Sequence, residues 1–81
     1  MSKKHAKLAQ GPRPLAERIT VARKEGRLQH ALELTRTYLK ENPCEERREL
    51  LRQVTLERGK QLLAEGKTKD AATVFQNVLA L

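Results

Sequence analysis

Aromatic side chains are almost absent from this chain of 81 residues, which has one Tyr, one Phe and no Trp. A buried core must therefore be built from Leu, Val and Ala, and the sequence lacks a set of aromatic rings on which nucleic-acid bases could stack. A single cysteine, Cys44, excludes an intramolecular disulfide framework and a cysteine-rich zinc site. This cysteine usage is typical of a reducing compartment, and we expect a cytoplasmic protein.

Long hydrophobic runs are missing as well. No stretch approaches the roughly 18 apolar residues that are needed to span a membrane. The charged N-terminus is not followed by the apolar segment of a secretory signal. We therefore expect no membrane among the partners of this protein.

Motifs that carry out catalysis or bind a cofactor are also absent. The sequence has no Gly-rich phosphate loop and no Ser-His-Asp set, and its two histidines, His5 and His30, cannot complete a zinc shell. Cys44 is followed closely by three glutamates, which oppose a reactive thiolate. We expect no enzymatic activity, no metal and no cofactor.

Positive charge is in excess and is concentrated at the start of the chain. The sequence has 17 Lys and Arg against 10 Asp and Glu, a net charge of +7, and residues 1–14 contain no acid. A breaker cluster around Gly11 separates a basic tail, residues 1–12, from a domain spanning residues 13–81. Such a tail is typical of a solvated terminus, and it can also contact nucleic acid. The bases of this first segment are Lys3, Lys4, Lys7 and Arg13.

In the domain, apolar residues recur at helical spacing in four segments that are separated by turn or breaker residues. We expect Pro14 in the first helical position of its helix, and Asn42 and Thr68 as N-caps, with Asn42, Pro43 and Glu45 resembling a capping box. The expected helices run from Pro14 to Glu25, from Leu28 to Glu41, from Pro43 to Glu65 and from Lys69 to Leu81.

Each expected helix has one apolar stripe that predicts its buried side. Gly59 lies inside the third helix, where glycine costs about 1 kcal/mol relative to alanine, so we expect a neighbouring helix to approach closely there. The stripes consist of Leu15, Ile19 and Ala22; of Leu28, Ala31, Leu32, Thr35, Tyr38 and Leu39; of Leu51, Val54, Leu62 and Leu63; and of Ala71, Ala72, Phe75, Val78 and Leu79.

The sequence repeats itself weakly with a period of forty residues. The shift aligns two turn glycines, Gly26 with Gly66, and two small residues that follow them, Ala31 with Ala71. It also aligns Leu39 with Leu79. A fixed period between 20 and 50 residues is typical of helical repeat proteins.

The repeated pattern resembles the tetratricopeptide repeat, a family in which each unit is a helical hairpin with Gly at its turn. The first unit matches the family motif with Gly26, Ala31, Leu39 and Pro43. The second matches with Gly66, Ala71, Phe75 and Leu79, and Gly59 falls on a small residue of the first helix. The period of forty exceeds the family's period of about 34, and the Trp and Tyr of its first helix are missing. The chain therefore resembles a degenerate member or a near relative.

The resemblance implies an all-α fold of two stacked antiparallel hairpins, a fragment of an α-solenoid, with units 13–43 and 44–81. A plain four-helix bundle with the same turns is the alternative. The implied function is a non-catalytic scaffold that binds an acidic or amphipathic peptide, or a partner protein, in a groove lined by the first helix of each hairpin. The implied groove residues are Arg13, Thr20, Arg23, Lys24, Gln53, Leu56 and Lys60.

Two further expectations concern partners. Because two repeats bury little surface, we expect either further repeats or self-association through the helix at residues 69–81. The alternative function is a basic nucleic-acid- or ribosome-associated helical protein that uses its N-terminal tail.

Overall fold

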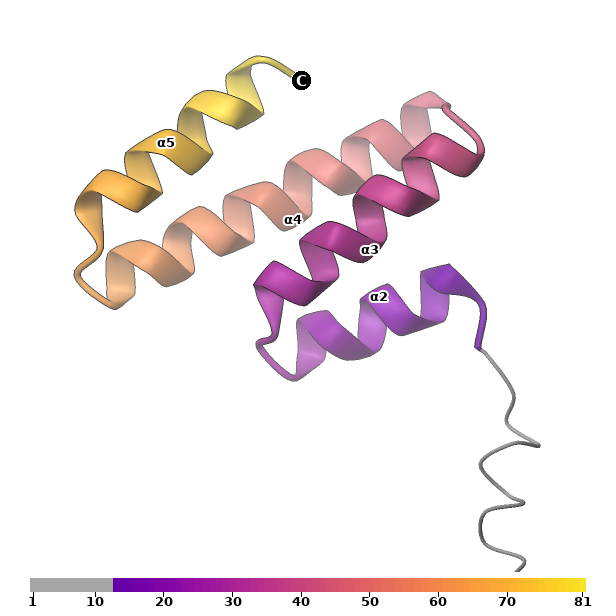
Figure 1. The fold of residues 1–81 in the computed structure, drawn as a ribbon, viewed down its shortest axis with the longest axis horizontal. Coiled ribbons are helices and arrows are strands. Elements are labelled where there is room, and N and C mark those ends of the chain that lie inside the picture. The colour runs from indigo at the N-terminus through magenta and orange to yellow at the C-terminus, as the bar shows by residue number, and fades with distance from the viewer. Residues whose placement is uncertain (1–12) are drawn as a thin grey trace, which may run out of the picture.

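A computed structural model describes residues 13–81, so Lys3, Lys4 and Lys7 of the basic tail lie outside the described residues. Residues 13–81 form four α-helices and no strand, which confirms the all-α prediction (Figure 1). Every helix end lies within two residues of its expected position. None of the described helices combines the length and the apolar character that crossing a membrane requires. The helices are α2 (Leu15–Lys24), α3 (Leu28–Glu41), α4 (Glu45–Ala64) and α5 (Thr68–Leu79).

The two interhelical turns that contain glycine are built in the same way. Gly26 has φ +76° and Gly66 has φ +81°, a left-handed conformation that glycine adopts without strain. The amide of Arg27 donates to the carbonyl oxygen of Ala22 at 2.9 Å, and the amide of Lys67 donates to that of Leu62 at 2.8 Å. These bonds satisfy helix-end carbonyl groups in the manner of a Schellman motif, forty residues apart.

The expected N-caps are wrong. Pro14, Arg27, Cys44 and Lys67 precede the four helices, and none of them makes a side-chain cap hydrogen bond. Asn42 is not a cap because Cys44 is still extended (φ −155°, ψ 165°), so α4 begins too far along the chain for the Asn42 side chain to reach its amides. Thr68 is already helical, because the turn leads into α5 one residue earlier than expected.

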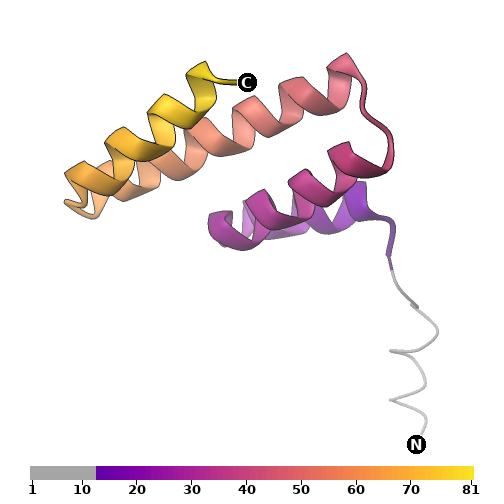
Figure 2. The same ribbon diagram turned by 45° about the horizontal axis from the view of Figure 1, so that its top comes forward.

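The helices pack in chain order, α2 on α3, α3 on α4 and α4 on α5. In Figure 1, α4 lies behind α3 and α5, and the turned view in Figure 2 also places α4 between them. The Cα atoms extend over 47 × 31 × 13 Å. A single helix spans about 5 Å between Cα atoms on opposite sides, and packed helices lie about 8–10 Å apart, so the shortest extent corresponds to about two layers of helices and leaves much of each helix in contact with solvent.

The core lies among α2, α3 and the first half of α4. The expected stripe residues Ile19, Ala31 and Val54 are at most 1% exposed, and Thr35 is fully buried. Thr35 donates its hydroxyl hydrogen to the carbonyl oxygen of Ala31 at 2.7 Å, so this polar atom is satisfied. The main cluster consists of Ile19, Ala22, Ala31, Leu32, Leu34, Leu51 and Val54, with Leu15, Tyr38, Leu39 and Leu50 packed against it.

Three residues that were expected to be buried are exposed. Leu63 is 48% exposed and Leu79 is 87% exposed, and Ala72 also lies in solvent. Leu63 is on the wrong side of α4, because Leu62 already occupies the position facing α5 and is buried. Ala72 and Leu79 are exposed because no described helix packs on the outer side of α5.

The close approach expected at Gly59 is confirmed. A Cβ atom added to this glycine would lie 2.5 Å from Cε1 and 2.7 Å from Cζ of Phe75 on α5. The missing side chain therefore lets the ring of Phe75 rest on the backbone of α4. Ala71, which is fully buried, provides the second close contact of α5.

Candidate partner-binding groove

The C-terminal end of α2 is joined to the middle of α4 by a two-pronged ion pair. Arg23 donates from Nε to Oε1 of Glu57 at 3.0 Å and from Nη2 to Oε2 at 2.6 Å. The hydrogen bonds to Glu57 raise the pKa of Arg23 above its ordinary value, so the guanidinium stays charged. Because the two residues are 34 positions apart, this pair fixes how the first hairpin lies on α4.

A second polar contact lies one turn further along α4 and reinforces the ion pair. Gln61 donates from Nε2 to the carbonyl oxygen of Gly26 at 2.9 Å. Arg58 in turn donates to the side-chain oxygen of Gln61 at 2.7 Å, which orients the amide. The turn between α2 and α3 is thus held against α4 by two contacts that involve neighbouring turns of the same helix.

The Arg23–Glu57 pair borders an open hollow of about 410 Å³. Three of the residues assigned to the groove from the sequence, Thr20, Arg23 and Lys24 of α2, line this hollow, and two further residues complete its lining. Leu28, which is 9% exposed, gives the hollow an apolar part, and Glu57 closes it on the α4 side. The hollow combines one apolar wall with a cation, Lys24, that makes no ion pair within residues 13–81.

The remaining predicted groove residues of α4 do not line this hollow. Gln53 and Lys60 lie one turn before and one turn after Glu57, so they share its side of the helix. Both are exposed, as is Leu56 beside them at 39%. The α4 row therefore extends from the hollow and offers an amide, an apolar side chain and a cation to solvent.

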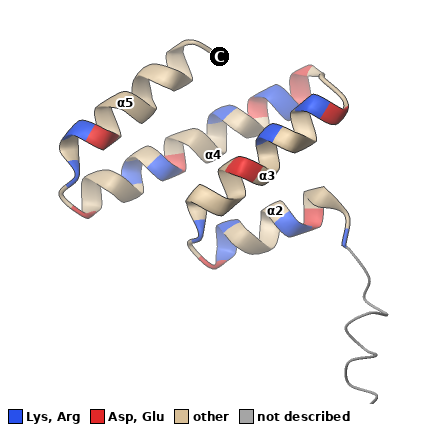
Figure 3. Cartoon of the chain, viewed as in Figure 1, with Lys and Arg blue, Asp and Glu red and all other residues tan. Residues whose placement is uncertain are grey.

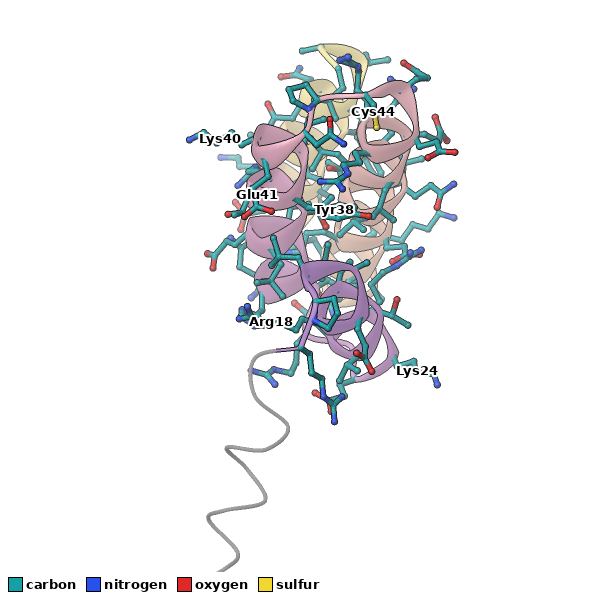
Figure 4. The ribbon with its side chains drawn as sticks, turned by 90° about the vertical axis from the view of Figure 1, so that its right-hand side faces the viewer. Arg18, Lys24, Tyr38, Lys40, Glu41 and Cys44 are labelled. Atoms are coloured by element: carbon teal, nitrogen blue, oxygen red, sulfur yellow. The ribbon has the colours of Figure 1, made fainter. Side chains whose placement is uncertain are left out.

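Arg13 lies elsewhere, which corrects its assignment to the groove. It lines a separate hollow of about 170 Å³ together with residues of α2, the first turn and α3. Arg18, Arg27 and His30 share this second hollow. Figure 4 shows Arg18 and Lys24 pointing to opposite sides of the first hairpin, so residues of α2 that are close in sequence serve different surfaces.

The second hollow is only weakly basic. Arg13 pairs with Glu17 at 3.9 Å, and Arg27 pairs with Glu25 at 3.2 Å. Arg18 is the one arginine of this hollow that pairs with no acid in the described part of the chain. These residues therefore add little to the positive charge of the tail, and they do not favour a nucleic-acid site over a peptide site.

Glu57 is the groove residue that sequence reasoning missed. The groove expected from the sequence included Arg23 but not Glu57, which pairs with Arg23 and offsets its charge. The signal was present, because Glu57 lies one turn after Gln53 on the same side of the helix. Within residues 13–81, no three His, Cys, Asp or Glu side chains lie close enough to share a metal ion.

Comparison with known proteins leaves the chain without an identified relative, since no family model, no curated protein and no solved structure matches it.

Proposed function

We propose that this chain is a tetratricopeptide-like helical repeat that acts as a non-catalytic scaffold. Its partner is a peptide or protein segment that binds along the surface formed by α2 and α4. The observation that carries the proposal is the hollow between these two helices, with the exposed row of α4 beside it. The exposed row consists of Gln53, Leu56 and Lys60. We call the hollow together with this row the groove.

The repeat interpretation is supported by equivalent features in the two hairpins. Each turn has a left-handed glycine and the same pair of capping hydrogen bonds. In each hairpin the alanine five residues after that glycine is fully buried: Ala31 in the first and Ala71 in the second. A side chain larger than alanine would separate the helices at both places.

The chemistry of the groove favours an acidic amphipathic segment. Lys24 and Lys60 form no ion pair with an acid of the described chain, so both are available to carboxylates of a partner. Leu28 within the hollow and Leu56 beside it can receive an apolar side chain. The Arg23–Glu57 ion pair adds no net charge to the groove, so Lys24 and Lys60 are the positions at which carboxylates of a partner can bind.

Selection from a displayed library of random peptides tests the proposal. We expect the selected peptides to be enriched in Asp, Glu and large apolar residues. Reversing the charge of both groove lysines, Lys24→Glu with Lys60→Glu, should weaken binding of a selected peptide by at least about tenfold, equivalent to about 1.4 kcal/mol. The matched control is Lys40→Glu on α3, an exposed lysine without an ion-pair partner in residues 13–81.

The control variant should bind the peptide within about twofold of the unchanged protein, which is within the usual effect of a distant surface charge. Equal binding by the double groove variant would refute the groove. Selection of no peptide, or of basic peptides, would refute the proposed partner chemistry. Circular dichroism of each variant checks that its helices are retained.

A further inference from the structure

An acid of the protein itself occupies the arginine of the groove. The carboxylate of Glu57 accepts hydrogen bonds from Nε of Arg23 at 3.0 Å and from Nη2 at 2.6 Å. Arginine holds the carboxylate of a bound partner with the same two-point geometry. Both residues line the hollow at which we expect an acidic segment to bind. Glu57 therefore lies at the position on Arg23 that a carboxylate of that segment would take.

The pair is accessible to a partner. The side chain of Arg23 is 28% exposed and that of Glu57 is 39% exposed, and the hollow that they line is open to solvent. Ion pairs between partly exposed groups contribute little to stability, because water solvates both groups when they separate. A carboxylate of a partner can therefore replace that of Glu57 at a small cost.

The first hairpin does not depend on this pair alone for its position on α4. Gln61 also holds the first turn, through its hydrogen bond of 2.9 Å to the carbonyl oxygen of Gly26. The packing of α3 on α4 involves the core residues Leu51 and Val54. These contacts remain when the ion pair separates, so the two helices that form the groove stay together.

Glu57 occupies the strongest carboxylate-binding group of the groove and leaves the weaker ones free. Arginine binds a carboxylate at two points, whereas lysine acts as a point charge. Lys60 lies one turn after Glu57 on α4, yet it forms no ion pair within residues 13–81, and neither does Lys24. Figure 3 shows acidic and basic residues interspersed along α4. The other ion pairs that α4 forms in the described chain stay within the helix, whereas Glu57 pairs across to α2.

We propose that Glu57 is an internal competitor, which lowers the affinity of the groove for an acidic partner by occupying Arg23. This inference rests on the proposed function, because it concerns the same partner. A partner carboxylate that displaces Glu57 takes over its hydrogen bonds to Arg23, and it gains only the difference between two similar contacts. Without the charge of Glu57, Arg23 is free and the same contact becomes a net gain. Glu57 thereby sets the strength of binding, whereas Lys24 and Lys60 bind the carboxylates.

Titration of a labelled selected peptide, followed by fluorescence anisotropy, tests the competition. Glu57→Gln keeps the size of the side chain and removes its charge, so it should tighten binding at least about fivefold. The matched control is Glu45→Gln, which removes the same charge from α4 and also breaks a pair with an arginine, Arg52. Glu45 lies about 18 Å before Glu57 along the helix, beyond the screening length of about 8 Å, so the control should bind within about twofold of the unchanged protein. Unchanged or weaker binding by Glu57→Gln, or an equal gain by both variants, would overturn the proposal.

Adding Arg23→Lys to Glu57→Gln tests whether the gain comes from the arginine. The double variant has the same net charge as Glu57→Gln alone, but lysine lacks a planar edge for a two-point contact. Most of the gain should be lost, and full retention would overturn the role of Arg23.

The two proposals fail in different ways. If binding responds to reversal of the groove lysines but not to Glu57→Gln, the competition is wrong and the groove stands. If reversal of the lysines has no effect, or no peptide is selected, the proposed function fails and this inference fails with it. Circular dichroism confirms that each variant is folded.

Discussion

Replacing Gly59 by alanine sets two effects of known size against one another. Alanine is the better helix former by about 1 kcal/mol, and Gly59 lies within α4 rather than at a turn. If the position were open to solvent, Gly59→Ala would therefore stabilise the protein. The ring of Phe75 decides the sign, because a Cβ at residue 59 would lie within 3.0 Å of three of its atoms.

The size of the opposing effect follows from the distances. Carbon atoms in contact prefer separations of about 3.5–4.0 Å, whereas the new Cβ would lie 2.5 Å from Cε1 of Phe75. The ring must therefore move by about 1 Å, and α5 must move with it or lose the contact. Inserting a methyl group into a packed contact costs about 1–3 kcal/mol. After subtraction of the helix-propensity gain of about 1 kcal/mol, we expect Gly59→Ala to lower the free energy of unfolding by up to about 2 kcal/mol.

Urea unfolding followed by far-ultraviolet circular dichroism measures this change, and a double-mutant cycle identifies its cause. Phe75→Leu removes the ring atoms that clash. In that background Gly59→Ala should stabilise the protein by up to about 1 kcal/mol, so the same substitution changes sign. Loss of stability in both backgrounds, or in neither, would refute the assignment of Phe75 as the obstacle.

Two further predictions concern single residues of the first hairpin, both measured by the same unfolding experiment. Gly26→Ala should lower the free energy of unfolding by about 1 kcal/mol, and Gly26→Asn should lower it by less, because φ is +76° at this position. No atom lies within 4 Å of a Cβ added here, so the cost comes from the backbone conformation alone. Equal stability of all three proteins would contradict this. Thr35→Val should leave the stability unchanged or raise it by up to about 1 kcal/mol, since the carbonyl oxygen of Ala31 keeps its helical hydrogen bond and a methyl group replaces a buried hydroxyl. A loss above about 1 kcal/mol would show that the hydroxyl bond is needed.

Periodicity and turn chemistry predicted the helices well, because both are local. Gly26 and Gly66 follow long apolar stripes and are the natural ends of their helices, and both are left-handed in the structure. The helix starts were predicted less well. No side chain caps them, so the presence of Asn42 or Thr68 at a plausible spacing was misleading.

Burial was predictable only where a neighbouring helix exists. Ala31 and Ala71 are each buried as the repeat predicted, since each faces the other helix of its own hairpin. Leu39 and Leu79 occupy equivalent positions in the sequence but differ in exposure, because coverage of these positions depends on the next helix in the stack. Periodicity identifies the apolar side of a helix, and it does not reveal whether anything packs there.

Which of the residues assigned to the groove lie together was predictable only in part, for a related reason. Thr20, Arg23 and Lys24 lie close together along one helix, so helical spacing alone brings them to one hollow. Arg13 precedes the helix, where spacing no longer applies, and it lies in the other hollow. The pairing of Arg23 with Glu57 depends on how two distant helices cross, which the sequence does not encode at short range.

The groove and the α5 helix belong to parts of the fold that differ in how well they are packed. The groove lies beside the main core cluster, whose members all come from α2, α3 and α4. The α5 helix contributes one buried residue, Ala71, and packs mainly against α4. It is therefore the helix that should open first when the protein unfolds.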